Sequence, residues 1–137
     1  MYILDTNVVS ELRKSDRADK NVVRWAQSVD ASTLFISPIT IMEIEIGILR
    51  LNKDKSQQEI LRKWFEEQVL ITFSERIIPI DQQVARACAQ LHIPDSKSDR
   101  DALIAATGIA HQMTIVTRNI QDFNGTGVKL LNPWEPV

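Results

Sequence analysis

Four acidic side chains, far apart in the sequence, stand where carboxylates could act together at one site. Asp5 ends a short apolar run, and Asp122 follows another apolar run by a few residues. Glu43 and Asp101 each lie in the first turn of a predicted helix. If folding gathers these carboxylates, they repel one another, and that repulsion favours the protonated form. A divalent cation removes the repulsion, and oxygen ligands favour Mg²⁺ or Mn²⁺.

One or two such ions would suit the hydrolysis of a phosphodiester. A bound divalent ion polarises phosphoryl oxygens, lowers the pKa of a bound water and stabilises the leaving oxygen. With only 2 His and 1 Cys in 137 residues, a zinc site is not expected. The candidate metal ligands and catalytic residues are therefore Asp5, Glu43, Asp101 and Asp122.

Each of the four acids also has a purely structural interpretation. Asp5 or Asn7 could cap the following helix, since Asp and Asn are preferred at helix N-caps. Glu43 and Asp101 could complement the dipoles of their helices, and Asp122 could belong to a turn. Other acids of the chain are interpreted as structural, with Asp81 and Asp99 as helix caps; they are Glu45, Asp81, Asp95 and Asp99.

Five short apolar runs predict the β-strands of the protein. They do not alternate strictly between polar and apolar residues, which is typical of strands buried on both faces of a sheet. A proline in the third run indicates an edge strand or a strand end. The predicted strands are Tyr2–Leu4, Thr33–Ser37, Arg76–Ile80, Thr114–Thr117 and Val128–Leu131.

Helices are predicted between these strands, where apolar residues recur at helical spacing. The helix over Asp99–His111 is rich in small residues and could pack closely on a sheet. The predicted helices are Val8–Leu12, Asn21–Ser28, Thr40–Leu51, Gln57–Phe73, a helix capped by Asp81 that continues through Leu91, and Asp99–His111.

The alternation of strands and helices predicts a three-layer α/β/α sandwich with a mostly parallel central sheet of four to five strands. Parallel strands require crossover connections, which are usually helices. The length fits a single domain that spans residues 1–137. In such a sheet the carboxyl ends of the strands share one edge, where ligands bind. We therefore expect the four acids to meet there.

Polar and basic neighbours of the acids could assist at this edge. Arg118 could contact a substrate phosphate or pair with one of the acids. Arg50 and Lys53 belong to a basic cluster that could follow a nucleic-acid backbone or form an ordinary solvated face. The residues that could orient the carboxylates or bound waters are Thr6, Asn7, Thr117 and Asn119.

The overall composition argues against several classes of protein. A formal net charge of -2 argues against non-specific nucleic-acid binding, which usually leaves a basic footprint. No apolar run approaches the roughly 20 residues that span a bilayer, and no signal peptide is visible, so no membrane association is expected. Cys88 is the single cysteine and fits a reducing compartment, so we expect a cytoplasmic protein.

Four segments, in this order, resemble PIN-domain proteins. They are Leu4–Glu11 (LDTNVVSE), Ser37–Glu43 (SPITIME) with Gly47 behind it, Asp101–Thr107 (DALIAAT) and Val116–Phe123 (VTRNIQDF). The similarity runs nearly end to end and includes Leu130–Trp134 (LLNPW). It is greatest for the VapC-type toxins of type II toxin–antitoxin systems.

The resemblance implies a Mg²⁺- or Mn²⁺-dependent endoribonuclease that hydrolyses RNA phosphodiester bonds. Asp5, Glu43, Asp101 and Asp122 match the acidic quartet of the family. The resemblance also implies a VapB-type antitoxin as partner, whose tail covers the acids and often places an arginine among them. Family members commonly form homodimers.

One segment departs from the family pattern. Many relatives carry a more apolar, proline-containing approach to the third acid, whereas Pro94–Arg100 is highly charged here. This charge leaves open whether Asp99 or Asp101 faces the metal. The Asp-x-Leu-Ile-Ala-Ala pattern favours Asp101.

Two other functions compete with the nuclease hypothesis. A phosphatase or another phosphoryl-transfer protein could use Asp5 as a nucleophile, but the common phosphatase pattern has a second acid where Asn7 stands. A non-catalytic partner-binding module could keep the fold, although nothing would then require it to keep all four acids.

Overall fold

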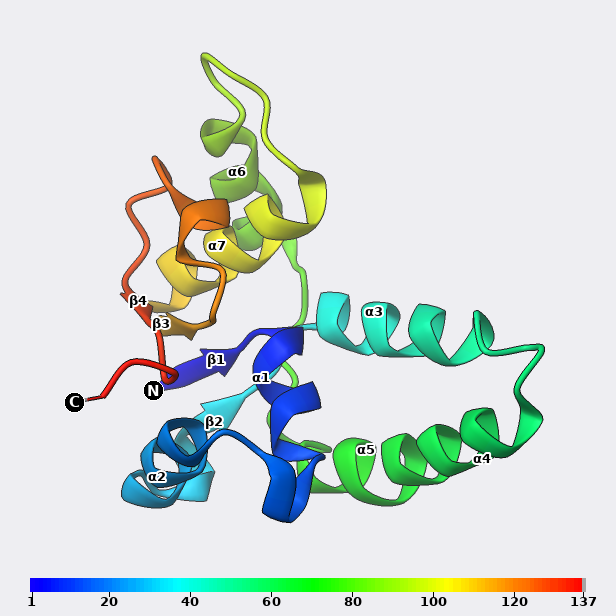
Figure 1. Cartoon of the computed structure of the whole chain (residues 1–137). Helices are drawn as coiled ribbons and strands as arrows, with labels where there is room; N and C mark the ends of the chain where they lie inside the picture. The colour runs from blue at the N-terminus through cyan, green and yellow to red at the C-terminus, as the bar shows by residue number, and fades with distance from the viewer. Residues whose placement is uncertain (137) are drawn as a thin grey trace.

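A parallel sheet of four strands organises the chain in the computed structural model, which describes residues 1–136 (Figure 1). Tyr2 pairs with Leu34 on one side and with Thr114 on the other. All pairs of neighbouring strands are parallel, so the strands end at the same edge of the sheet. The strand order is β2 (Leu34–Phe35), β1 (Tyr2–Leu4), β3 (Thr114–Val116) and β4 (Leu130–Leu131).

Helices connect the strands and cover both faces of the sheet, which confirms the predicted α/β/α architecture. The α-helices are α1 (Thr6–Leu12), α2 (Lys20–Ser28), α3 (Pro38–Leu49), α4 (Lys55–Trp64), α5 (Leu70–Thr72), α6 (Gln82–Leu91) and α7 (Asp99–His111). Shorter elements are the 3-10 turns η1 (Ser15–Arg17), η2 (Ala31–Thr33) and η4 (Ile120–Phe123), and the π-helical turn η3 (Phe65–Val69).

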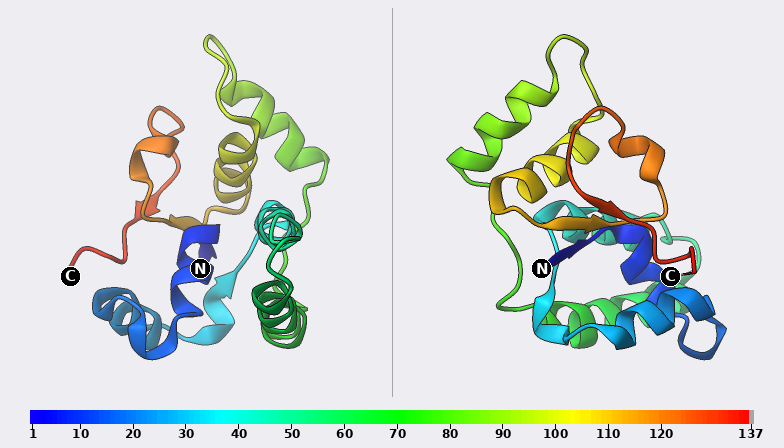
Figure 2. Two further views of the ribbon diagram at one scale, coloured as in Figure 1. Left: turned by 45° about the vertical axis from the view of Figure 1, so that its right-hand side comes forward. Right: turned by 90° about the vertical axis from the view of Figure 1, so that its left-hand side faces the viewer.

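Neighbouring residues of one strand are buried in different cores, because successive side chains point to opposite faces of a sheet. Ile3 of β1 and Ile115 of β3 pack with α7, while Leu4 and Val116 pack with α1, α2, α3 and η3. Helix α6 packs on α7 rather than on the sheet, through Cys88 and its neighbours. The two further views show α6 and α7 on one side of the sheet and α1 and α2 on the other (Figure 2).

Helices α1 and α3 begin at the carboxyl edge of the sheet, directly after β1 and shortly after β2. Asp5 caps α1 by accepting a hydrogen bond from the backbone N–H of Thr6 at 2.9 Å. Ser37 caps α3 by accepting a hydrogen bond from the N–H of Ile39 at 3.0 Å. Pro38 lies in the first turn of α3, where a missing N–H is harmless. Helix α3 therefore begins earlier in the chain than the predicted Thr40.

The predicted strand Arg76–Ile80 is wrong. Only Ile77 forms a bridge in this segment, and it pairs in parallel with Ile36. Two hydrogen bonds hold the bridge: the N–H of Ile36 donates to the Arg76 carbonyl at 3.0 Å, and the N–H of Ile78 donates to the Ile36 carbonyl at 3.1 Å. The next bond of the ladder would need an N–H at Pro38, which has none and begins α3, so the pairing stops there.

Other predicted boundaries differ from the structure by a few residues. The helix predicted over Gln57–Phe73 is present as α4, η3 and α5 in direct succession, with one π-helical turn inside it. The helix predicted over Asp99–His111 is confirmed, and Asp81 caps α6 as predicted, by accepting a hydrogen bond from the N–H of Val84 at 3.0 Å. Among residues 1–136, the helices are all too short or too polar to cross a membrane.

Gly108 marks the close approach of α7 to the sheet, and its substitution tests that packing. A Cβ at this position would lie 2.8 Å from Cγ2 of Val128 and 2.9 Å from Cδ1 of Ile115. We expect Gly108→Ala to lower the free energy of unfolding by about 1–3 kcal/mol through overpacking. Urea denaturation measures this change.

Gly47→Ala in α3 is the matched control, because a Cβ there meets no atom of residues 1–136 within 4 Å. This variant should raise the free energy of unfolding by about 0.5–1 kcal/mol, since alanine favours a helix more than glycine does. Stabilisation by both substitutions would contradict the close packing of α7 on the sheet.

Candidate active site at the carboxyl edge of the sheet

Asp5 is a buried carboxylate at the end of β1, with only 7% of its surface exposed. Its Oδ1 accepts the hydrogen bond from Thr6 that caps α1. Its Oδ2 accepts hydrogen bonds from Thr117 Oγ1 at 2.8 Å and from Asn7 Nδ2 at 3.1 Å. Burial raises the pKa of Asp5, and the hydrogen bonds from Thr117 and Thr6 oppose that rise. Asp5 therefore caps a helix and also places a carboxylate at the carboxyl edge of the sheet, which we call the rim.

Asn7 and Thr117 connect α1 to the loop that follows β3. The Nδ2 group of Asn7 also donates to Thr117 Oγ1 at 3.2 Å, and its Oδ1 accepts a hydrogen bond from the backbone N–H of Arg118 at 3.1 Å. The backbone N–H of Asn119 donates to Thr117 Oγ1 at 3.0 Å. The Asn119 side chain forms no hydrogen bond with the acids within residues 1–136, so its contribution here is through the backbone.

Glu43 lies beside Asp5, on the facing side of α3. Thr6 Oγ1 donates a hydrogen bond to Glu43 Oε1 at 2.6 Å and lies 3.2 Å from Thr40 Oγ1. The negative charge of Glu43 contributes to the raised pKa of Asp5, which places the two carboxylates in each other's field. Thr6 thus joins the two acids, since its N–H holds Asp5 and its hydroxyl holds Glu43.

Asp101 lies close enough to the other three acids for their negative charges to influence its pKa. Burial is the largest cause of its raised pKa, and the charges of Asp122, Asp5 and Glu43 follow in that order. Asp101 is in the first turn of α7, and Asp122 is an exposed residue of η4. The structure therefore brings all four predicted acids to one rim.

Asp99 faces away from this rim. Its side chain is 90% exposed, and its Oδ1 lies 3.5 Å from Nε2 of His92. The N-cap of α7 is Ser98, so the predicted capping role of Asp99 is wrong by one residue. Asp101, rather than Asp99, is the acid of this segment that neighbours the other three.

Arg100 is a rim residue that the sequence did not single out. Its Nη1 lies 3.5 Å from Oε2 of Glu43, so a positive charge from α7 reaches an acid of α3. The available signal was its position directly before Asp101, in the first turn of a helix expected to begin at this edge.

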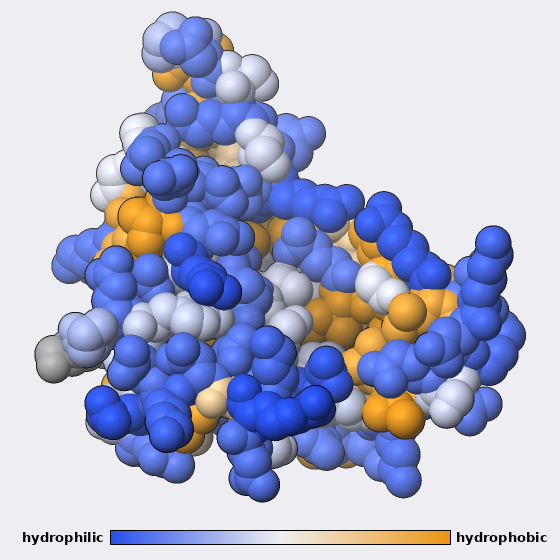
Figure 3. Space-filling view, viewed as in Figure 1, coloured by the Kyte–Doolittle hydropathy of each residue, from blue (hydrophilic) through white to orange (hydrophobic). Residues whose placement is uncertain are grey.

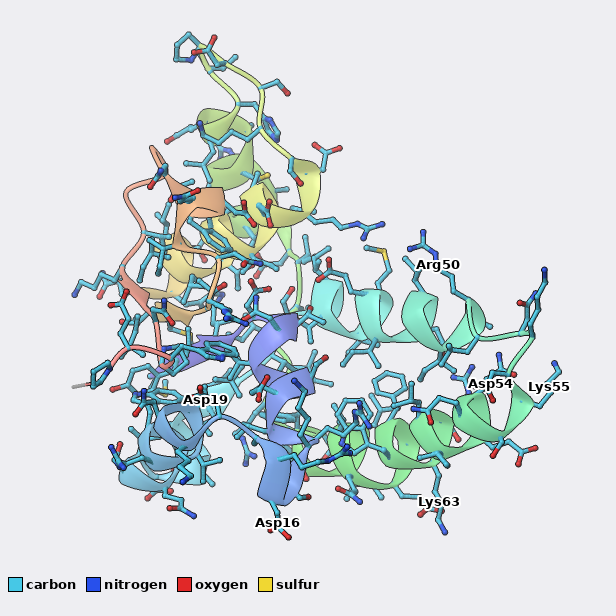
Figure 4. All side chains as sticks on the ribbon, in the orientation of Figure 1. Asp16, Asp19, Arg50, Asp54, Lys55 and Lys63 are labelled. Atoms are coloured by element: carbon cyan, nitrogen blue, oxygen red, sulfur yellow. The ribbon has the colours of Figure 1, made fainter. Side chains whose placement is uncertain are left out.

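The other predicted cations lie in two separate places. The Arg118 guanidinium lies over the Trp134 ring, 5.2 Å from its centroid, at the rim itself. Arg50 and Lys53 lie toward the far end of the hairpin formed by α3 and α4; Figure 4 labels Arg50 above α3 and Asp54 and Lys55 at the start of α4. Arg50 is about 10 Å along the helix from Glu43, from the rise per residue of an α-helix.

The donors at the rim fit a hard divalent cation. They are carboxylate oxygens, the ligands that Mg²⁺ and Mn²⁺ prefer. Among residues 1–136, no three His, Cys, Asp or Glu side chains already form a metal-binding group. Glu43 and Asp122 are accessible to solvent and can turn toward an ion. The repulsion that raises the pKa of Asp101 is the repulsion that a cation would relieve.

Comparisons with known proteins point to one family. A family model described as PIN domain matches residues 2–127. The chain is 34% identical to the VapC ribonuclease Y4jK of Sinorhizobium fredii, with 100% of both chains covered. It is 32% identical to toxin FitB of Neisseria gonorrhoeae, with 98% of this chain and 99% of that protein covered.

The fold is similar as well. The structure matches the crystal structure of FitAcB from Neisseria gonorrhoeae with a TM-score of 0.87 at 32% identity, covering 98% of this chain and 99% of that chain. Since the family model spans nearly all of the sequence and the relatives match from end to end, the chain belongs to the PIN-domain family.

Proposed function

We propose that this PIN-domain protein is the toxin of a toxin–antitoxin pair and cleaves RNA. It hydrolyses phosphodiester bonds with the help of Mg²⁺ or Mn²⁺, and a VapB-type antitoxin neutralises it. The observation that carries the proposal is the meeting of four carboxylates from four elements at one edge of the sheet, where Thr6 joins Asp5 to Glu43 by hydrogen bonds. The relatives named as a VapC ribonuclease and as toxin FitB support the same activity.

Asp5, Glu43, Asp101 and Asp122 would hold the ion. When bound, such an ion polarises phosphoryl oxygens and lowers the pKa of a coordinated water. Hydrogen bonds orient two of these ligands: Thr117 and Asn7 donate to Asp5, and Thr6 donates to Glu43. Residues that orient ligands in this way typically contribute about 10–100-fold to metal affinity or activity.

The phosphatase alternative is less well supported by the geometry. Asp5 is almost fully buried, and both of its oxygens already accept hydrogen bonds. The position of a second phosphatase acid is occupied by Asn7, which donates one of those bonds. Water is therefore the attacking group in our proposal, and no covalent intermediate forms on Asp5.

The choice between Asp101 and Asp99 gives a direct test of the site. Asp101→Asn should lower kcat for RNA cleavage by more than about 100-fold, because it removes a ligand rather than a supporting group. Asp99→Asn makes the same chemical change two residues away and should stay within about twofold of the parent, since Asp99 faces His92. Single-turnover cleavage of a labelled RNA measures both; equal losses would contradict the assigned site.

Thermal unfolding tests the metal and the pH dependence together. In metal-free protein, Asp101→Asn should raise Tm at neutral pH, because the charged form of Asp101 is disfavoured in the folded state. A carboxyl group whose pKa is higher in the folded state than in the unfolded state lowers the free energy of unfolding. This effect is complete above the raised pKa and vanishes below the ordinary one. The gain in Tm should therefore shrink as the pH falls through the raised pKa toward the ordinary Asp range.

Added Mg²⁺ or Mn²⁺ should raise the Tm of the parent but not that of Asp101→Asn. Because protons and metal compete for the same carboxylates, the metal effect on the parent should weaken over the same fall in pH. A metal-induced shift of equal size in both proteins, or RNA cleavage that persists in excess EDTA, would contradict a metal site at this rim.

An apolar groove beside the rim fits the antitoxin part of the proposal. It has a volume of about 230 Å³, runs between α1, α3 and α4, and has Thr6 and Glu43 at one end. Figure 3 shows apolar side chains gathered between α3 and α4. An amphipathic segment can lay its apolar face into such a groove. Its apolar walls include Ile44, Ile48, Leu51, Leu61 and Trp64.

Leu51 and Leu49 provide a matched pair for testing this groove. Leu51 lines the groove, whereas Leu49 is 57% exposed and lies outside its lining. With a VapB-type antitoxin that neutralises the parent as the probe, Leu51→Glu should weaken binding by about tenfold or more, since it places an unpaired charge in an apolar contact. Leu49→Glu should stay within about twofold; equal effects would contradict this docking surface.

A further inference from the structure

A polar hollow adjoins the acids on the side of β4. Its volume is about 640 Å³, within the range of ligand pockets in proteins. Asp122 belongs both to this hollow and to the acidic rim, so a molecule in the hollow lies next to the proposed reaction centre. The polar side chains that line it are Arg118, Asn119, Gln121, Asp122, Asn132 and the exposed Glu135.

Arg118 is held in place at the wall of this hollow. Its backbone N–H donates to Asn7 Oδ1, and its guanidinium stacks over the Trp134 ring. Within residues 1–136 the guanidinium forms no hydrogen bond and no ion pair within 4.0 Å. A cation–π contact with a ring uses none of the N–H donors of the guanidinium, so they remain available to a ligand.

Trp134 is itself fixed by two hydrogen bonds. Its backbone N–H donates to Asn132 Oδ1 at 3.0 Å, and its carbonyl accepts from Asn21 Nδ2 at 2.8 Å. The stacked arginine therefore rests on a supported ring rather than on a loose tail. A pre-positioned guanidinium loses less side-chain entropy when it binds an anion.

We propose that this hollow is the subsite for the nucleotide next to the scissile phosphate of the RNA. Arg118 binds a backbone phosphate of that nucleotide, and the amides of Asn119, Gln121 and Asn132 contact the edge of its base. This inference rests on the proposed ribonuclease function. Phosphate contacts position a nucleic acid, whereas contacts to base edges select its sequence.

A contact of this kind offsets the negative charge around the acids. The formal net charge is -2, and the acids at the rim repel a polyanion. The Arg118 charge also contributes to the lowered pKa of Glu11, after the larger effects of hydrogen bonds from Lys14 and Asp19. A fixed cation beside Asp122 lets a phosphate approach the acids without a basic surface.

Binding of single-stranded RNA homopolymers tests the phosphate contact. Measured in the Asp101→Asn background to prevent cleavage, Arg118→Gln should weaken binding to all four homopolymers by a similar factor. It should also make the slope of log Kd against log salt shallower by about 0.7, the value for one phosphate contact in a single strand. Arg86→Gln, an equal charge change on the exposed face of α6, should change neither quantity.

Gln121→Ala tests the base contact and should act differently. It should change the relative affinities of the four homopolymers by several-fold while leaving the salt slope unchanged, because a base contact carries sequence preference and no charge. Arg118→Lys keeps the charge but loses the planar fork, so its binding should lie between that of the parent and Arg118→Gln.

The outcomes separate this inference from the proposed function. If the parent cleaves RNA with Mg²⁺ or Mn²⁺ but Arg118→Gln and Gln121→Ala bind all homopolymers as the Asp101→Asn protein does, the subsite is wrong and the nuclease stands. If the parent cleaves no RNA, the proposed function fails, whatever the binding shows. An unchanged Tm in each variant shows that altered binding does not come from unfolding.

Discussion

The buried carboxylate of Asp5 is the constraint on which the rest of the site depends. A charge removed from water is destabilising unless hydrogen-bond donors replace its hydration. Those donors come from three places: the first N–H of α1, the Asn7 amide and the Thr117 hydroxyl. The N–H of Asp5 also donates to the Val116 carbonyl at 2.9 Å, which sets β1 and β3 in the register that brings Thr117 to the carboxylate.

Much of this arrangement could be predicted from sequence, because it depends on order along the chain. In a parallel sheet, residues that follow strands and begin helices share one edge, so the four acids could be placed together before any contact was known. Contacts that depend on packing could not be predicted in this way. The approach of Arg100 to Glu43 and the stacking of Arg118 on Trp134 join separate elements, and no spacing encodes them.

Where the predicted elements and caps differ from the structure, the cause lies in the neighbouring residues. The Arg76–Ile80 run has strand-like composition, but the facing strand ends where Pro38 begins α3 without an N–H for the next ladder bond, so one bridge remains. At the start of α7, Ser98 and Asp99 are both good caps, and only the backbone conformation decides between them. Asp5 was expected to be either a cap or a ligand; the geometry allows one side chain to serve both, since its two oxygens face different donors.

The hydrogen bonds around Asp5 also join residues made at very different times. A chain emerges from the ribosome from its N-terminus at about 5–20 residues per second, so β1 appears long before β3. Until Thr117 has emerged, Asp5 lacks its hydroxyl donor, and until Asp122 has emerged the rim lacks one of its acids. The complete acidic rim therefore exists only after Asp122 has emerged and the chain has folded.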